Sequence, residues 1–462
     1  MTSRVLSAFF FITLVSSITS DPTGLKLRFT SRTLDVLKDL GLEYMQTLVN
    51  HRFADFNFQG RIFKATIKGF KFTYLSVNPA QTAVSFQPNS GLQFEIRNMG
   101  FSGEFVRSFY MHFLWRDRRL STKSVTFSGR GVNIKIGVNL KRNPQGHLNV
   151  QISTCEVKAD HIITRHHSIL GRLWDLLKPL YRWLFNRKFC PAVQEYAVPK
   201  INAMLESITM TKKLHESYNL DYHLSSNITV TPSCLNVPFR GVFFRQGETV
   251  DLSSIKSCMD PVFSESYRMA YVGFSEFFFN SIAMSLQKTG PFKLTIPKLS
   301  YLKERALAAV GLSTGRIKVK LAQSPTVRIS RNGVSATVNA RVQSLARPAN
   351  KNPTVPVDCQ VDIKVDIKGN RLILRSTKPV KCKLKPKTFT GRFMALFVNI
   401  GINKYITGTL KRLIEGLLIP LPEGVHYTEG KIDYHDGFVV IGGSLNFTPA
   451  GRRTVLKRIG RV

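Results

Sequence analysis

The chain has 462 residues, of which 43% are hydrophobic, and its 66 basic and 29 acidic residues give it a net charge of +37. After residue 20 no uninterrupted apolar run approaches the roughly 18 residues that a membrane span needs, so a transmembrane helix is excluded. The length is sufficient for two domains with their own cores. A charge this large predicts an anionic partner: lipid headgroups, envelope phosphates, polyanionic glycans or, less favoured, nucleic acid.

The first 20 residues have the pattern of a secretory signal peptide. MTSRVLSAFFFITLVSSITS contains one positive charge at Arg4, an apolar run from Val5 to about Val15, and small polar residues up to Ser20. We therefore exclude 1–20 from the fold and expect a secreted, extracellular protein.

Six cysteines in an exported chain predict three disulfides, with metal binding as the minor alternative. None of them has the CxxC spacing of a zinc site. Six cysteines permit 15 connectivities, and their spacing favours sequential pairing: Cys155 with Cys190, Cys234 with Cys258, and Cys359 with Cys382.

The first domain reads as a strand, a helix and a long meander. Alternation in 24–30 predicts a strand, and Ser31 is the expected N-cap of a helix over 32–49. Short alternating runs from about 56 to 152, broken by Asn-Pro and Asn-Ser-Gly turns, predict an antiparallel sheet. Helical periodicity returns over 168–190, with a kink at Pro179.

The second half repeats this plan after an irregular, proline-containing linker over 231–262. A strand, MAYVGF, precedes Ser275 and a helix from Glu276 to Gly290, and three strands with similar breaks follow. The period is near 245 residues, which indicates two homologous domains, 21–230 and 263–462. A late helix is expected over 399–418, and the chain closes in a strand pair that turns at Asp436-Gly437.

The sequence contains no enzymatic motif in the structural context that it requires. We therefore expect neither a catalytic residue nor a metal. GLSTG resembles a nucleophile elbow around Ser313, but a helical segment precedes it and a strand follows, which reverses the required context. His161, His166 and His167 lack a supporting acidic or cysteine ligand at a recognisable spacing, so surface histidines are favoured. The sequence argues against an enzyme and requires no cofactor.

Two features are candidates for surface roles. Asn227 and Asn446 each begin an N-glycosylation sequon, and Asn227 is the better candidate because Asn446 lies in the last expected strand. WRDRRLSTK, over 115–123, has the pattern of a hairpin tip that binds phosphates while its aromatic rings enter an acyl layer. A solvated loop is the equal alternative.

The order of elements resembles the family of bactericidal/permeability-increasing protein, lipopolysaccharide-binding protein and the plasma lipid transfer proteins. The resemblance covers almost the whole mature chain. It is most specific in PTGLKLRFTSRTLDVLKDLG, in RMAYVGFSEFFFNSIAMSLQKTG and in the spacing of Cys155 and Cys190. LNVPFRGVFF and the ending from GLLIPLPEGV to GGSLNF also match.

The resemblance implies an α+β fold in which two pseudo-symmetric domains, each a twisted antiparallel β-barrel with two helices, are joined by a central sheet as a boomerang. It implies Cys155–Cys190 as the family disulfide, and a bound phospholipid in apolar pockets. The helical stripes supply the pocket candidates, any of which can instead be core: Leu37, Tyr44, Leu48, Leu173, Leu177, Phe278, Phe279, Ile282 and Leu286. The candidates for an anionic headgroup are Lys64, Lys68, Arg116, Arg118, Arg119 and Lys123.

We therefore expect a secreted protein that binds anionic bacterial lipid, chiefly lipopolysaccharide, through basic tips and acyl-chain pockets, and has innate antibacterial activity. A phospholipid carrier for host lipids such as phosphatidylserine is the close alternative. A polyanion-binding adhesion protein is a third, since it needs only the charge. Peripheral contact with membranes is expected, and the sequence leaves the oligomeric state open.

Overall fold

The fold is taken from a computed structural model of the chain. It describes residues 21–52, 55–59, 63–113, 116–166, 186–187, 189–191, 193–215, 218–256, 259–296, 298, 300–345, 354–368, 371–376, 380–385, 415–418, 425–449 and 451–453. The expected signal peptide, the helix expected over 168–190 apart from its last residues, and Leu173, Leu177 and Cys258 lie outside this set.

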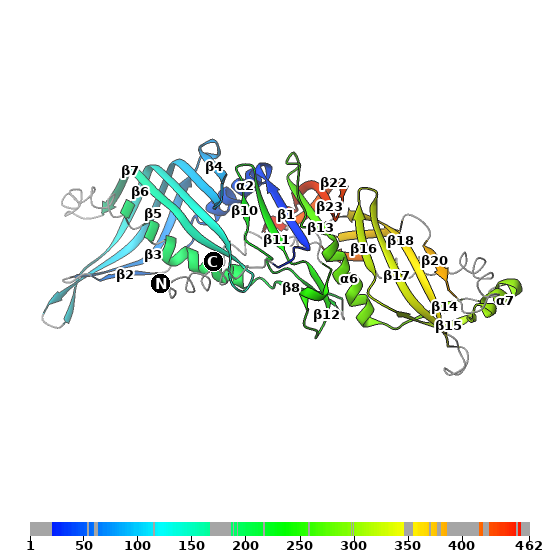
Figure 1. The fold of residues 1–462 in the computed structure, drawn as a ribbon. Coiled ribbons are helices and arrows are strands. Elements are labelled where there is room, and N and C mark those ends of the chain that lie inside the picture. The colour runs from blue at the N-terminus through cyan, green and yellow to red at the C-terminus, as the bar shows by residue number, and fades with distance from the viewer. Residues whose placement is uncertain are drawn as a thin grey trace, which may run out of the picture.

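The molecule is elongated, with a curled antiparallel sheet at each end and a third sheet between them (Figure 1). The fold class is α+β with few helices, as expected. Among the described residues, no helix is long and apolar enough to cross a bilayer. Each end sheet is built from one half of the chain, whereas the central sheet takes strands from both halves.

The N-terminal sheet has the strand order β2-β3-β5-β6-β7, with β4 paired to β5. Breaks in register between β3, β5 and β6 bend these long strands, because each bulge increases the local twist. The strands are β2 (Phe56–Gln59), β3 (Phe63–Ser76), β4 (Thr82–Gln87), β5 (Gly91–Phe113), β6 (Arg116–Arg142) and β7 (Leu148–His166).

Two of the described helices contact the N-terminal sheet. Helix α2 (Ser31–Thr47) packs mainly against β4, and the residues at its end reach the apolar face of the sheet. Helix α5 (Val198–Glu206) follows a π-helical turn, Val193–Ala197, and lies against β7. There the Asn202 side chain accepts from the Val150 N–H at 2.8 Å and donates to its carbonyl at 2.9 Å.

The central sheet joins the two halves through equivalent strands. Its order is β10-β11-β1-β13-β23-β22, with β1 (Leu25–Thr30), β10 (Thr229–Val230), β11 (Cys234–Phe239), β13 (Ala270–Ser275), β22 (Val425–His435) and β23 (Phe438–Phe447). β1 and β13 begin the two repeats and pair antiparallel, with Leu27 opposite Val272. These two residues are 245 positions apart, so the pairing is centred on a pseudo-two-fold axis.

The expectation of an irregular linker is wrong, and the expected late helix is contradicted at its last four residues. The stretch 231–262 is not irregular throughout: it contributes β11 to the central sheet and β12 (Val242–Arg245) to a small sheet with β8 (Thr211–His215) and β9 (Tyr218–Asp221). The end of the expected late helix is strand β21 (Glu415–Leu418), which pairs with β19 because its leucines complete the edge of the sheet. Residues 399–414 lie outside the described set.

Of the two expected serine caps, one is corrected and the other is confirmed in its position. Helix α2 begins at Ser31 and has Thr30 as its N-cap, whereas α6 (Glu276–Thr289) has the expected Ser275 as its N-cap. Neither cap side chain accepts a bond from its own helix. The Thr30 hydroxyl donates to Arg268 O at 2.7 Å, and the Ser275 hydroxyl donates to Thr23 O at 2.8 Å. Each hydroxyl thus ties its own repeat to the other one across the pseudo-axis.

The C-terminal sheet has the order β14-β15-β17-β18-β19-β21, with β16 on β17 and β20 on β18. Its core is continuous with that of the central sheet and α6. The remaining elements are β14 (Phe292–Ile296), α7 (Tyr301–Ala309), β15 (Gly315–Leu321), β16 (Thr326–Ser330), β17 (Gly333–Ser344), β18 (Thr354–Lys368), β19 (Arg371–Ser376) and β20 (Lys381–Leu384).

Among the described residues two disulfides are formed, with the pairing that spacing favoured. Cys155–Cys190 ties β7 to a helical segment after the undescribed stretch, and Cys359–Cys382 joins directly opposed residues of β18 and β20. The third expected bridge, that of Cys234, is not formed, because Cys234 is a free thiol. It is buried in β11, where its sulfur lies 3.0 Å from the Thr231 hydroxyl.

Candidate functional site

The apolar face of the N-terminal sheet carries a cluster of phenylalanine rings. Phe70 and Phe72 come from β3, Phe101 and Phe105 from β5, and Phe127 from β6. Ring centroids lie 5.1 Å apart for Phe70 and Phe127 and 5.9 Å apart for Phe72 and Phe101, within the range of favourable aromatic contacts. Sequence analysis did not identify this cluster.

The tripeptide Phe-Ser-Gly occurs on both central strands of this cluster and explains its geometry. In the antiparallel register Phe101 lies opposite Gly129, and Gly103 lies opposite Phe127. A Cβ atom on Gly129 would lie 2.4 Å from Cζ of Phe101, and one on Gly103 would lie 2.3 Å from Cζ of Phe127. Each ring therefore occupies the space that the missing side chain of the opposite glycine leaves. The repeated tripeptide was the signal available in the sequence.

A shallow surface groove of about 410 Å³ lies on the opposite face of these strands. The register pairs Tyr74 with Ser102 and Ser102 with Ser128, and these positions alternate with the phenylalanines, so the side chains that reach the groove are polar, small or charged, with Glu104 and Arg130 among them. Two of its lining side chains are exposed: Tyr74 by 58% and Ile163 by 39%.

The interior lined by the phenylalanine cluster, called the hollow below, is only partly filled by the described residues. Five side chains of this cluster are fully buried, namely Leu75, Met99, Phe101, Val132 and Ala159. Met45, Leu48 and Val49 pack against them from the end of α2 but stay half-buried, as do Phe72 and Phe127. Covering such side chains with an apolar ligand would remove further apolar surface from water, which is favourable by about 25 cal/mol per Å².

The predicted pocket residues separate into two groups. On α2, Tyr44 and Leu48 are half-buried and Leu37 is 38% exposed, so all three retain surface that a ligand can cover. On α6, Phe278 and Phe279 are 2% and 4% exposed and pack in the large core of the central and C-terminal sheets. Their ring centroids are 5.3 Å apart, so both are core residues in this structure. Ile282 and Leu286 are half-buried.

The predicted headgroup residues lie on β3 and β6, the two strands that flank β5. The hairpin of β5 and β6 reaches past the rest of the N-terminal sheet at that end of the molecule (Figure 1). The register places Arg116 opposite Phe113, Arg118 opposite Met111, and Arg119 opposite Tyr110. Lys123 lies opposite Arg107, Lys64 opposite Tyr110, and Lys68 opposite Val106. Arg119 and Lys68 are exposed, and the Arg119 Nε donates to the Thr122 hydroxyl at 2.7 Å.

The structure divides these cations into two sets along the strands. Arg116 and Arg118 lie eleven and nine residues before Phe127 on β6, which at about 3.4 Å per residue is roughly 30–40 Å. Lys123 lies four residues before Phe127, and Lys68 lies two residues before Phe70. The tip is therefore farther from the phenylalanine cluster, and the inner lysines are closer to it.

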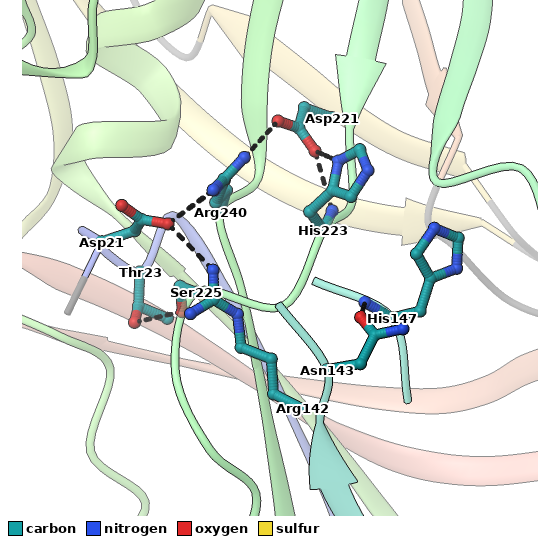
Figure 2. Close-up of polar contacts among 9 residues, drawn as sticks. All are labelled: Asp21, Thr23, Arg142, Asn143, His147, Asp221, His223, Ser225 and Arg240. Atoms are coloured by element: carbon teal, nitrogen blue, oxygen red, sulfur yellow. Dashed lines mark hydrogen bonds and ion pairs between the residues drawn. The ribbon is translucent and has the colours of Figure 1, made fainter. Parts of the chain in front are cut away.

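A polar network joins the N-terminal sheet to the central sheet (Figure 2). The Asp21 carboxylate accepts from Arg240 at 2.8 Å and from Arg142, at the end of β6, at 3.3 Å. Arg240 also pairs with Asp221 at 3.5 Å, and Asp221 accepts from the His223 backbone N–H at 2.7 Å. Charges of alternating sign thus run from one sheet to the other.

The turn between β6 and β7 reinforces this junction. Within the turn, the His147 N–H donates to the Asn143 side chain at 2.8 Å, and Gly146 O accepts from the Leu224 N–H at 2.8 Å. Gly146 has φ +81°, and a Cβ there would lie 2.9 Å from Cβ of His223. Figure 2 shows His147 and His223 on the same side of the network; their ring centroids are 5.7 Å apart.

Two cations on β1 hold the linker against the central sheet. Burial lowers the pKa of Lys26, with Asp260 opposing the shift, and its Nζ donates to Pro261 O at 3.0 Å. Burial likewise lowers the pKa of Arg28, which donates to the Asn236 side chain at 2.8 Å and to Phe263 O at 3.0 Å. Both groups therefore hold the linker and the residues after it against β1.

The remaining sequence candidates lie in ordinary surroundings. Ser313 follows α7 and precedes β15, and its hydroxyl contacts that of Ser344. Across the described residues no group of three His, Cys, Asp or Glu side chains could hold a metal ion. His167 lies outside that set. Asn227 and Asn446 are both exposed, although Asn446 pairs with His426 within the last strand pair.

Comparison with known proteins gives consistent matches. The profile of the LBP / BPI / CETP family, C-terminal domain, matches residues 212–447. The human phospholipid transfer protein is 24% identical over 97% of this chain and 95% of its own length. Bovine lipopolysaccharide-binding protein is 20% identical over 94% and 96% of the two chains, and rat bactericidal permeability-increasing protein is 21% identical over 93% and 94%.

The fold is shared with a crystal structure of lipopolysaccharide binding protein, which has a TM-score of 0.54 and 15% identity. The match covers 92% of this chain and 99% of that one. The sheets at the two ends and the sheet between them thus form an arrangement already seen in a solved protein.

Proposed function

Since this chain belongs to the LBP / BPI / CETP family, we propose that it is a secreted carrier of anionic amphiphilic lipids, with bacterial lipopolysaccharide as its main ligand. The observation that carries the proposal is the position of the partly filled, phenylalanine-lined hollow on the same strands as the basic hairpin. The acyl chains would occupy the hollow, and the lipid phosphates would meet Lys123, which lies on the same sheet face as Phe127.

The energetics of such a site favour retention without a strong polar contact. Each methylene removed from water contributes about 0.8 kcal/mol, so several methylenes in the hollow suffice for stable binding. The net charge of +37 adds attraction to an anionic surface, worth about 1 kcal/mol for each basic residue near it. Antibacterial activity would follow from recognition of the bacterial surface by the hairpin tip.

A carrier of host phospholipids is the second candidate. It is favoured by the similarity to phospholipid transfer protein, which extends over 97% of this chain. In that case the same hollow would take phosphatidylserine or a related lipid, and the hairpin would dock on host membranes or lipid particles. No enzymatic step belongs to either proposal.

Organic extraction of the purified protein, followed by lipid mass spectrometry, tests whether it carries lipid at all. We expect about one diacyl lipid or more in each protein, because acyl chains that cover the half-buried phenylalanines would remove apolar surface from water. A lipid-free protein that also fails to take up labelled phospholipid would rule out both carrier proposals and favour polyanion binding.

The triple variant Arg116→Ser/Arg118→Ser/Arg119→Ser separates the two ligands. We expect at least a tenfold loss of binding to lipopolysaccharide and little change for neutral vesicles, because the tip contributes mainly charge. Arg97→Ser is the matched control: it removes an exposed arginine of β5 that already pairs with Glu95 at 2.7 Å. Unchanged lipopolysaccharide binding with full phospholipid transfer would favour the second candidate.

A further inference from the structure

Helix α7 forms the far end of the C-terminal barrel. It lies at the opposite end of the molecule from the β5–β6 hairpin (Figure 1). Its inner side contributes Ala306 and Leu307 to the C-terminal core, where they are 4% and 1% exposed, and Val310 and Leu312 continue this packing just after it. The helix is thus fixed to the barrel along one side, and its other side faces solvent.

The outer side of α7 presents two large apolar side chains. Tyr301 is 70% exposed and Leu302 is 77% exposed, the two highest values among the large hydrophobic residues that the structure describes. Leu345, just after β17, adds a third that is 38% exposed. Its N–H donates to Arg316 O at 2.8 Å, so it lies at the same end of the barrel. Single exposed apolar residues are common, whereas a group at one tip indicates an interaction surface.

Basic residues surround this apolar group. The Arg305 guanidinium lies 5.7 Å from the Tyr301 ring centroid, and Lys298 and Arg316 are exposed nearby in the chain and in β15. Glu304 is the one acidic residue of the helix, and it is half-buried. Apolar and aromatic residues beside Lys and Arg are the composition of helices that lie in a membrane interface.

We propose that this surface, the α7 tip (Lys298, Tyr301, Leu302, Arg305, Arg316 and Leu345), binds the headgroup and acyl boundary of an anionic phospholipid membrane. Leu302 enters the acyl layer, and the Tyr301 ring lies at headgroup level with its hydroxyl hydrated. The basic side chains pair with lipid phosphates, which makes the charge of the tip complementary to the membrane.

The fold presents the tip as a rigid element. After α7 the Leu312 N–H donates to Leu307 O at 3.0 Å, and the Ser313 N–H donates to the Ser344 hydroxyl at 3.0 Å. These bonds fasten the helix to the end of β17, so little conformational entropy is lost when the tip docks. The proposal does not depend on which lipid the N-terminal hollow carries.

Depth-dependent quenching tests the proposal directly in the full-length protein. The variant Leu302→Trp is mixed with phosphatidylcholine vesicles, with and without phosphatidylglycerol, that contain a doxyl-labelled lipid. The three native tryptophans, Trp115, Trp174 and Trp183, all lie in the N-terminal half and supply the background from the unsubstituted protein. We expect additional quenching from position 302 on anionic vesicles, and none from the control Met259→Trp, whose site is 64% exposed but distant from the tip.

Loss of binding is measured with Tyr301→Ser/Leu302→Ser. We expect the partition coefficient on anionic vesicles to fall about tenfold, since two interfacial apolar side chains are removed. The matched control is Met259→Ser/Val262→Ser, which removes two side chains that are 64% and 59% exposed elsewhere on the surface. Circular dichroism confirms that each variant is folded.

Three outcomes would overturn the proposal. Vesicle binding without quenching at position 302 would assign membrane contact to the N-terminal hairpin alone. Equal losses for the tip and control pairs would show that the location is irrelevant. A dimer that the tip variant dissociates, with unchanged vesicle binding, would assign the surface to a second copy of the chain. Quenching at position 302 in a protein that carries no lipid would leave the tip valid and refute only the proposed carrier function.

Discussion

Two glycines of the N-terminal barrel make room for aromatic rings because they have no side chain. The paired Phe-Ser-Gly segments allow Phe101 to lie over Gly129 and Phe127 to lie over Gly103. Aromatic rings placed over glycines of a neighbouring strand are a known means of stabilising such positions in sheets. Removal of this space should affect both the stability of the barrel and the shape of the hollow.

Gly129→Ala should destabilise the N-terminal half by about 1–3 kcal/mol, the usual cost of overpacking, because the new Cβ displaces the Phe101 ring. The control is Gly100→Ala, where the nearest atom to the new Cβ lies at 3.7 Å. Tryptophan fluorescence during urea unfolding measures the effect, since all three tryptophans precede residue 230. Equal midpoints for the two variants would contradict the packing described here.

Tyr427 gives the central sheet a predictable response to alkaline pH. Burial raises the pKa of Tyr427 above its ordinary value of 10.0, and its hydroxyl contacts Ala270 O at 2.9 Å and Ile441 O at 2.6 Å. Above pH 10 the unfolded chain has lost this proton while the native state retains it. The native state then binds more protons, so the free energy of unfolding falls as pH rises.

Tyr427→Phe should make this fall shallower between about pH 10 and 11, while costing about 1 kcal/mol at neutral pH through the lost hydrogen bond. Tyr222, whose pKa burial also raises, should keep part of the slope. Guanidinium unfolding from pH 8 upward measures both effects. The interpretation fails if the variant and the unsubstituted protein lose stability in parallel.

Individual residues were the hardest part to infer from sequence. Alternation shows which residues share a strand face, but it does not show which residue of the next strand lies opposite, and the Phe-Ser-Gly pairing depends on that register. The hydrogen bonds of the two cap side chains could not be predicted for a related reason. Thr30 and Ser275 bind carbonyl groups more than 230 positions away, and no local pattern encodes such a bond.

At the scale of elements, the sequence located most helices and turns. The helices expected over 32–49 and 276–290 begin and end within two residues of α2 and α6, because their amphipathic stripes are strong. The Asp436-Gly437 turn is also confirmed, with Gly437 at φ +88°. Residues 415–418 were predicted as the end of a helix and form a strand, because apolar residues in a short edge strand and in a helix give similar patterns.

The Cys359–Cys382 bridge should stabilise the strand pair that it connects. Its ring spans 23 positions, for which the loop-entropy model gives about 3 kcal/mol. In the variant Cys359→Ala/Cys382→Ala we therefore expect faster hydrogen exchange in β18 and β20, by roughly a hundredfold if opening is local. Mass spectrometry of the corresponding peptides measures this.

Cys234→Ala is the control for this experiment. It removes a buried thiol that forms no disulfide, so β18 and β20 should keep their protection. If exchange in both variants matched that of the unsubstituted protein, the bridge would contribute nothing to local stability.

At the scale of the whole molecule, duplication accounts for the elongated shape. The repeat period of about 245 residues in the sequence reappears as the pairing of Leu27 with Val272. Two similar halves joined through equivalent strands give a central sheet and two opposite ends. In this chain the two ends differ. The N-terminal end has an aromatic hollow and a long basic hairpin, whereas the described part of the C-terminal end has a dense core and the α7 tip.

The network around Asp21 determines how firmly the N-terminal barrel is held to this shared sheet (Figure 2). Arg240→Gln leaves Asp21 and Asp221 without their shared partner. Because these groups are about a quarter exposed or less, we expect a loss of about 1 kcal/mol, below the usual value for a fully buried charged bond. Peptides covering 21–25, 142–147 and 221–225 should then exchange hydrogen roughly fivefold faster, without a change in the C-terminal sheet.

Arg331→Gln is the matched control, because Arg331 pairs with Asp436 at 3.7 Å while both side chains are more than 70% exposed. Exposed pairs of this kind contribute little, so its exchange pattern should equal that of the unsubstituted protein. If Arg240→Gln also left hydrogen exchange unchanged, the barrel would be held by the apolar contacts of the central sheet alone. If exchange rose throughout the chain, the network would support global stability instead of the junction, and the two halves would not open independently.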